Sequence, residues 1–314
     1  MPGIFIISFD CEGKWGMDPL KSRHEYYFTN DRLNKAYEKI TNILDRKEIK
    51  GTFAFVGAFT MSKDEYQANR DWFSDIYING ENRLAHFKRA AGFNHFDGWL
   101  NPDAFDMVKK KSHEIASHSF RHIPLPENMI TRDIFKNEME LIKKVSKLKG
   151  IEPKTFIYPQ NLIGYQNQLL KAGFIGYRMG VKQSHIKRSQ RLKNLLSEVN
   201  IWTRAQEPCQ SQNLEQPVSI PSGHFLNWRY SLRKKVPITI TLKKWSYLIN
   251  DAIQNNRILH LYTHPHNFVD GDQMYLLLDR ILKLISDAIR KGDMVNYTQK
   301  EYVDQQLKLQ TISS

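Results

Sequence analysis

Three short stretches of the chain gather side chains that can perform hydrolytic chemistry. Each follows an apolar run and carries a pair of carboxylates or imidazoles: Asp10 and Glu12, His118 and His122, His264 and His266. Two carboxylates can supply a metal ligand and a general base. Two imidazoles four residues apart, on one face of a helical turn, can both reach one ion. Any one pair also occurs in ordinary turns and polar surfaces, so the argument depends on finding all three.

The chemistry that these pairs favour is hydrolysis of an amide or ester. A carboxylate and two histidines bind a divalent ion of the zinc class and leave one position open for water. Such an ion lowers the pKa of water from 15.7 toward about 7, which makes a nucleophile at neutral pH. A second carboxylate can accept the proton of the water, and another histidine can protonate the leaving group. A Cys11 thiolate is the rival nucleophile, but no base lies near it in the sequence.

The elements that must position these residues alternate between strands and helices. Apolar runs predict buried strands at 4–9, 52–56, 113–116, 155–158, 174–178 and 258–263. Helical spacing and end signals predict helices near 33–44, 131–150, 167–172, 245–253 and 278–292. This alternation is typical of parallel β/α units, whose active sites form at the C-terminal ends of the strands. The expected fold class is therefore an α/β barrel.

Two stretches, at about 60–101 and 182–236, interrupt this alternation. The first is polar and aromatic, and the second is basic with scattered prolines. We interpret both as loop insertions over the active-site face of one domain that spans residues 1–314, because barrels vary most at that face.

Composition and charge exclude several classes of protein. With 41% hydrophobic and 25% charged residues, the 314-residue chain has enough apolar material for a large core. Two cysteines exclude a disulfide scaffold and favour the cytoplasm. Because the first apolar run reads as a strand, we expect no secretion signal before it. No apolar run approaches the ~20 residues of a transmembrane helix, although peripheral membrane association stays open. The net charge of +13 suits an acidic partner or lysine-rich helix faces, but without a binding motif we expect no nucleic acid.

The order of the motifs resembles the polysaccharide deacetylase family (the NodB-like fold of carbohydrate esterase family 4), from Ile4 to about Val303. Residues 8–13 look like the first family motif, and 117–122 are similar to its His-Ser/Thr-x-x-His metal motif. Residues 156–161 take the place of the Arg-x-Pro-Tyr motif, and 261–264 that of the final Leu-x-His. Trp15-Gly16 and Pro159-x-Asn161 look more like the branch associated with bacterial surface-polysaccharide biosynthesis.

This resemblance implies a distorted (β/α) barrel and an activity. The implied activity is removal of an N-acyl group, acetyl or formyl, from an amino sugar, with a divalent ion such as zinc as cofactor. The sugar would be nucleotide-linked, lipid-linked or part of an oligosaccharide. Asp10 matches the catalytic base of the family, His118 and His122 match its metal imidazoles, and His264 matches the histidine that protonates the departing amine.

Three positions depart from the family pattern. Cys11 stands where the family has its metal-binding Asp, and we expect Glu12 to complete the ligand set instead. Ile157 replaces the Arg that pairs with the catalytic carboxylate, and Arg178 is the candidate substitute. Gln160 replaces a Tyr whose backbone N–H binds the oxyanion, a role that survives a change of side chain.

Further residues are expected to contact substrate: Trp15 as a wall of the groove, together with Pro159, Gln160, Asn161, Arg178 and His266. The three departures also motivate an alternative function. In that case the chain is a catalytically silent barrel that binds a glycan or a partner protein.

Overall fold

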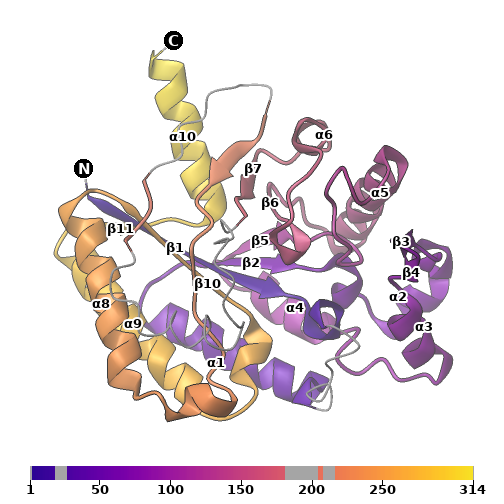
Figure 1. Cartoon of the computed structure of the whole chain (residues 1–314), viewed down its shortest axis with the longest axis horizontal. Helices are drawn as coiled ribbons and strands as arrows, with labels where there is room; N and C mark the ends of the chain where they lie inside the picture. The colour runs from indigo at the N-terminus through magenta and orange to yellow at the C-terminus, as the bar shows by residue number, and fades with distance from the viewer. Residues whose placement is uncertain (1, 18–26, 181–203, 208–215, 314) are drawn as a thin grey trace.

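The computed structural model describes residues 2–17, 27–180, 204–207 and 216–313. Its main sheet has the order β8-β7-β6-β5-β2-β1-β10-β9, with β11 on β1, and every neighbouring pair is parallel. The strands are β1 (Gly3–Cys11), β2 (Thr52–Phe55), β5 (Glu114–Ser117), β6 (Thr155–Ile157), β7 (Gly176–Arg178), β8 (Val218–Ile220), β9 (His224–Phe225), β10 (Ile258–Thr263) and β11 (Met294–Asn296). The sheet curls into a half-barrel (Figure 1), which confirms the predicted α/β barrel class.

Helices surround this sheet (Figure 1). They are α1 (Asn30–Arg46), α4 (Pro102–Lys109), α5 (Arg132–Lys149), α6 (Gln166–Lys171), α8 (Ile238–Gln254), α9 (Gln273–Arg290) and α10 (Gln299–Ser313). The ends of α5 match the sequence signals: the Thr131 side chain accepts a hydrogen bond from the Ile134 N–H, and Gly150 ends the helix at a φ of 61°. Within the described ranges, no helix combines the length and apolarity that a membrane crossing requires.

The segment 60–101 carries its own small elements beside the sheet. These are α2 (Lys63–Ala68), β3 (Tyr77–Ile78), β4 (Glu81–Asn82) and α3 (Ala85–Gly92), on the right of Figure 1. Among the described residues, the strands β3 and β4 pair with each other alone, as an antiparallel hairpin. This segment therefore adds nothing to the main sheet.

The stretch predicted as a second insertion, 182–236, contains part of the barrel. Residues 181–203 and 208–215 lie outside the described residues, but β8 pairs with β7 and β9 pairs with β10. Three residues, 221–223, join β8 to β9. Residues 218–225 therefore link the two ends of the curled sheet, and the prediction of a loop was wrong there. The strands are only three and two residues long, too short for a periodic pattern.

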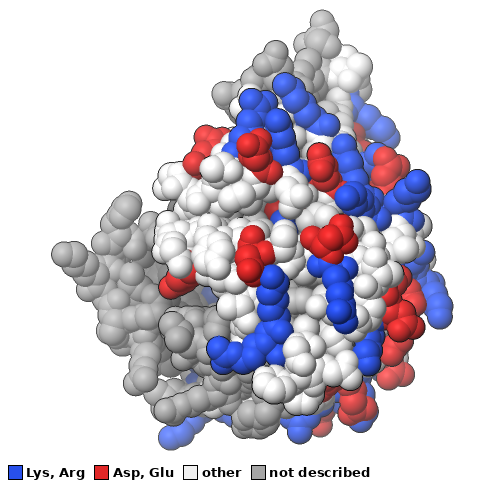
Figure 2. Space-filling model, turned by 90° about the vertical axis from the view of Figure 1, so that its right-hand side faces the viewer, with Lys and Arg blue, Asp and Glu red and all other residues white. Residues whose placement is uncertain are grey.

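The surface over α2, α3 and α5 mixes both signs of charge. Figure 2 shows lysine and arginine side chains interleaved with aspartate and glutamate on this face. Several of them pair, including Lys88 with Asp75 at 2.5 Å and Lys149 with Glu65 at 2.6 Å. This face therefore offers no patch of a single sign for a nucleic acid.

Candidate active site

Alternation along β1 places Asp10 and Glu12 on the same side of the sheet. Successive side chains of a strand point to opposite faces, so Ser8 and Asp10 share one face and Cys11 faces the other way. Glu12 directly follows the strand and lies on the side of Asp10, because His264 is close to both carboxylates. The Cys11 side chain is fully buried in the apolar core. The residue one position beyond the family's usual ligand is thus the one directed into the site.

Glu12 meets two histidines that come from the end of β5. Its Oε2 atom lies 3.3 Å from His118 Nε2 and 2.8 Å from His122 Nε2. His118 Nδ1 lies 2.8 Å from the Ile157 carbonyl, which can only accept, so Nδ1 carries the proton and Nε2 presents its lone pair to Glu12. His122 Nε2 is buried, and its contact with Glu12 lacks the geometry of a hydrogen bond. This donor set fits a divalent ion better than it fits a hydrogen-bonded network.

The loop that carries these histidines is not the helical turn that the sequence predicts. Ser119 and His122 both have positive φ angles, of 63° and 53°. The Ser119 hydroxyl accepts a hydrogen bond from the His122 N–H at 2.9 Å, and buried Glu138 accepts from the N–H groups of Phe120 and Arg121. The imidazoles therefore converge because α5 anchors the loop through Glu138, which spacing alone does not reveal.

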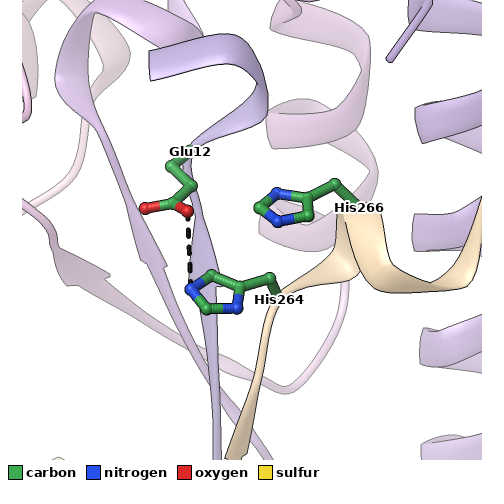
Figure 3. Close-up of side chains that lie close together, drawn as sticks. All are labelled: Glu12, His264 and His266. Carbon is green, nitrogen blue, oxygen red and sulfur yellow. Dashed lines mark ion pairs between the residues drawn. The ribbon is translucent and has the colours of Figure 1, made fainter. Parts of the chain in front are cut away.

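His264 and His266 also lie within 4.8 Å of Glu12, measured between possible ligand atoms (Figure 3). Glu12 Oε1 is 3.4 Å from His264 Nε2. The two rings, however, stack with centroids 4.8 Å apart and planes only 13° apart. The lone pairs of imidazoles lie in the ring planes, so stacked rings do not direct them at one ion. The rings of His118 and His122 are inclined by 62° and can converge, which leaves His264 available for proton transfer.

Asp10 forms a two-pronged ion pair with Arg178 from the end of β7. Both guanidinium Nη atoms lie 2.7 Å from the carboxylate oxygens, and the guanidinium also lies over the Tyr262 ring, 4.4 Å from its centroid. Burial alone would raise the pKa of Asp10, but the Arg178 charge and its hydrogen bonds outweigh burial and lower it. Arg178, at the end of β7, thus supplies the cation that the family pattern places at the position of Ile157.

Replacing Arg178 with methionine is expected to destabilise the protein by about 3–5 kcal/mol near neutral pH, because Asp10 would remain buried without a partner. In the wild type, the lowered pKa of Asp10 stabilises the folded protein at pH values above the unfolded-state pKa near 3.8, and this stabilisation is lost as the pH falls through the folded-state pKa. In the variant, burial without Arg178 raises the pKa of Asp10, so protonation at acidic pH removes the cost of burying its charge. Urea unfolding from pH 7 to pH 4 should show the difference between the proteins shrinking, and a constant difference would contradict the pairing.

Glu12 is held in place by a close approach of the backbone. A Cβ atom on Gly16 would lie 1.9 Å from Glu12 Oε1, so any larger residue there displaces the carboxylate. Burial opposes ionisation of Glu12, but the nearby His264 and His122 imidazoles bring its pKa well below the usual value. The carboxylate is therefore anionic and sterically fixed.

The Gly16→Ala substitution is expected to weaken binding of a divalent ion by about 10- to 100-fold, the usual effect of disturbing a ligand's support. Titration with Zn²⁺ under competition from a chelator measures this. Gly92→Ala is the matched control, because a Cβ there meets nothing within 4 Å and Ala favours the helix. Equal affinities of the two variants would show that Glu12 does not depend on Gly16.

Other predicted site residues lie in different surroundings. Trp15 is 8% exposed, packs against Phe87 and Trp99 and donates its indole N–H to the Trp99 carbonyl at 2.8 Å. It belongs to the aromatic core, and its prediction as a groove wall was wrong. His266 is half-buried between His264 and Phe28.

The turn after β6 holds the remaining candidates. Pro159 is buried and Gln160 is exposed, and both Gln160 and Asn161 have a φ of 56°. Asn161 Oδ1 accepts a hydrogen bond from Arg178 at 2.9 Å. Asn161 therefore supports the guanidinium rather than standing free for a ligand.

The rival nucleophile, Cys11, is chemically inert in this setting. Burial, together with the neighbouring Asp10 and Glu12 carboxylates, raises the pKa of its thiol well above the usual value, and a hydrogen bond with Tyr37 only partly opposes this. The thiol stays protonated at neutral pH and faces away from the site.

Two buried polar residues at the site received no role from the sequence. Ser8 and His260 are both fully buried, and Ser8 Oγ lies 2.9 Å from His260 Nε2. The sequence did contain a signal for them, because each is a polar residue within a mostly apolar strand.

Comparison with known proteins places the chain in a family. The polysaccharide deacetylase family model matches residues 21–179, which include His118, His122 and Arg178. The chain therefore belongs to the polysaccharide deacetylase family, and this membership supports carbohydrate deacetylation as the general class of activity. The first motif and His264 lie outside the matched range. No curated protein matches the sequence.

Solved structures share the fold at low sequence identity. A polysaccharide deacetylase structure from Mycobacterium smegmatis has a TM-score of 0.64 and 13% identity, covering 98% of this chain and 91% of that chain. Another, from Pseudomonas aeruginosa PAO1, has a TM-score of 0.57 and 12% identity, covering 96% of this chain and 89% of that chain. At such identity these similarities define the fold alone.

Proposed function

We propose that this protein is a metal-dependent amide hydrolase that removes an acetyl or formyl group from an amino sugar during surface-glycan assembly. The observation that carries the proposal is the convergence at one edge of the sheet of Glu12, His118 and His122 with the Asp10–Arg178 pair and His264.

The proposed ligands of the ion are Glu12, His118 and His122. One carboxylate and two imidazoles suit zinc and leave a position open. When bound, the ion would supply Lewis acidity that activates water and polarises the acyl oxygen.

The side chains of the chain move the protons. Asp10 accepts the proton of the attacking water, and Arg178 keeps this carboxylate ionised and oriented. His264, whose Nε2 lies 3.9 Å from Asp10 Oδ2 and whose side chain is 22% exposed, donates a proton to the leaving nitrogen. The backbone N–H of Gln160 is the proposed oxyanion donor. The carbonyl carbon gains a bond to oxygen and loses its bond to nitrogen, releasing a carboxylic acid and a free amine.

Several finer points stay predictions. These are the surface-polysaccharide branch, a cytoplasmic location, a single domain over residues 1–314, and a sugar carried on a nucleotide, a lipid or an oligosaccharide. His266, Pro159 and Gln160 remain candidates for contact with that sugar.

Metal analysis and an activity panel test the proposal. The purified protein is expected to contain about one divalent ion per chain and to release acetate or formate from at least one N-acyl amino sugar. Chelation should abolish the release, and zinc should restore it. A metal-free protein that binds sugar without hydrolysing it would favour the silent barrel instead.

A further inference from the structure

A chain of hydrogen bonds runs behind Arg178, away from the proposed ligands. Ser8 Oγ lies 3.3 Å from Arg178 Nη1 and 2.9 Å from His260 Nε2. His260 Nδ1 lies 2.7 Å from the Pro221 carbonyl. Both Ser8 and His260 are completely buried, so water does not compete for these contacts.

The direction of every bond in this chain is fixed by chemistry. A carbonyl only accepts, so His260 Nδ1 carries the proton and donates to Pro221. A guanidinium only donates, so Ser8 Oγ accepts from Arg178 and gives its own proton to His260 Nε2. This arrangement needs a neutral imidazole in one tautomer. Burial, with the nearby Arg178 charge, lowers the pKa of His260 to about 3 and keeps it neutral.

The backbone is shaped around this imidazole at the join between β8 and β9. Gly223 has a φ of +84°, and a Cβ atom there would lie 3.0 Å from His260 Cγ and 2.8 Å from the His260 carbonyl oxygen. The break in the strand that brings Pro221 to His260 therefore depends on a glycine.

The Arg178 guanidinium needs this support because few other hydrogen bonds fix its orientation. Its Nε atom is buried with no hydrogen-bond partner. Beyond Asp10, the hydrogen bonds of its Nη atoms within the described residues go to Ser8 on one side and Asn161 on the other, while the Tyr262 ring packs against its face. Removing one of these flanking hydrogen bonds would let the guanidinium rotate out of the plane of the Asp10 carboxylate.

We propose that His260 and Ser8 are positioning residues that hold Arg178 in its two-pronged contact with Asp10. The inference rests on the proposed function only in taking Asp10 as the base. Neither residue touches the reacting atoms, and both act through the guanidinium.

Kinetics of His260→Phe and Ser8→Ala test the proposal. We expect kcat to fall about 10- to 100-fold with KM within about twofold, the usual cost of disturbing a supporting shell. Ser8→Ala removes only a hydroxyl, which keeps the test decisive if His260→Phe fails to fold.

Thr155→Val is the control, since it removes a buried hydroxyl that donates to Glu114, away from the site. It should lower stability without lowering kcat. An unchanged kcat in both His260→Phe and Ser8→Ala would overturn the proposal.

Nitrogen NMR of the histidine side chains tests the same network without any substrate. In the full-length protein, His260 is expected to show the Nδ1–H tautomer and no titration down to about pH 4. Ser8→Ala should shift the Nε2 resonance. An Nε2–H tautomer would overturn the proposal even if the protein proves active. Failure of the wild type to hydrolyse any N-acyl sugar would instead count against the proposed function.

Discussion

Replacing His118 with alanine is expected to remove both the metal and the turnover while the fold survives. His118 is 2% exposed, and its Nδ1 proton is held by the Ile157 carbonyl, so its Nε2 lone pair faces the Glu12 carboxylate, which has no proton to donate to it. With two of three ligands left, affinity for zinc should fall by at least about 100-fold. Metal content, acetate or formate release, and circular dichroism check the three parts of this expectation.

The matched control for this variant is His95→Ala, because His95 is exposed in the segment 60–101. It should keep both metal and activity. Undiminished turnover in His118→Ala would refute the assignment of the site.

Replacing Asp10 with asparagine is expected to keep the metal and lose the rate. Asp10 is engaged by Arg178 rather than by the histidines, so the proposed ligand set stays intact. Loss of the general base should lower kcat by about 10²- to 10⁴-fold. Metal analysis and steady-state kinetics of the same preparation separate the two effects.

A double variant keeps this expectation apart from a loss of stability. Asp10→Asn leaves the Arg178 charge buried without a carboxylate, which is itself destabilising. Adding Arg178→Met should restore stability but not activity. Recovery of activity in the double variant would show that Asp10 acts only through folding.

Most of the long elements were predictable because each satisfies a simple pattern over many residues, but the 15-residue helix α10 was not predicted. The strand at 258–263 was predicted with its exact bounds, since its residues before Thr263 are apolar except for His260. The helix after Thr131 was predicted from its cap, its stripe and Gly150. The strands β8, β9 and β11 were not predicted. β8 and β9 lie in the basic stretch with scattered prolines, and all three strands are defined by long-range pairing rather than by a local pattern.

The site was predictable in its residue types but less so in its geometry. The expectation that Arg178 could serve as a substitute cation rested on its place at a strand end, and the structure puts it against Asp10. The left-handed backbone at Ser119 and His122 has no signature in sequence, because neither residue is glycine. Trp15 was misjudged because an aromatic residue near a motif looks the same in a groove and in a core.

The alternating direction of the side chains at the end of β1 affects how this protein is aligned with its relatives. An alignment by column sets Cys11 opposite the second aspartate of the usual motif, which would label this chain as degenerate. In space Glu12, one position further along, lies on the same side as Asp10, where we propose that it binds the ion, and Gly16 leaves room for its longer side chain. The substitution Cys11→Asp would therefore not add a carboxylate to the site. It would bury an unpaired anion among the apolar side chains around Tyr37.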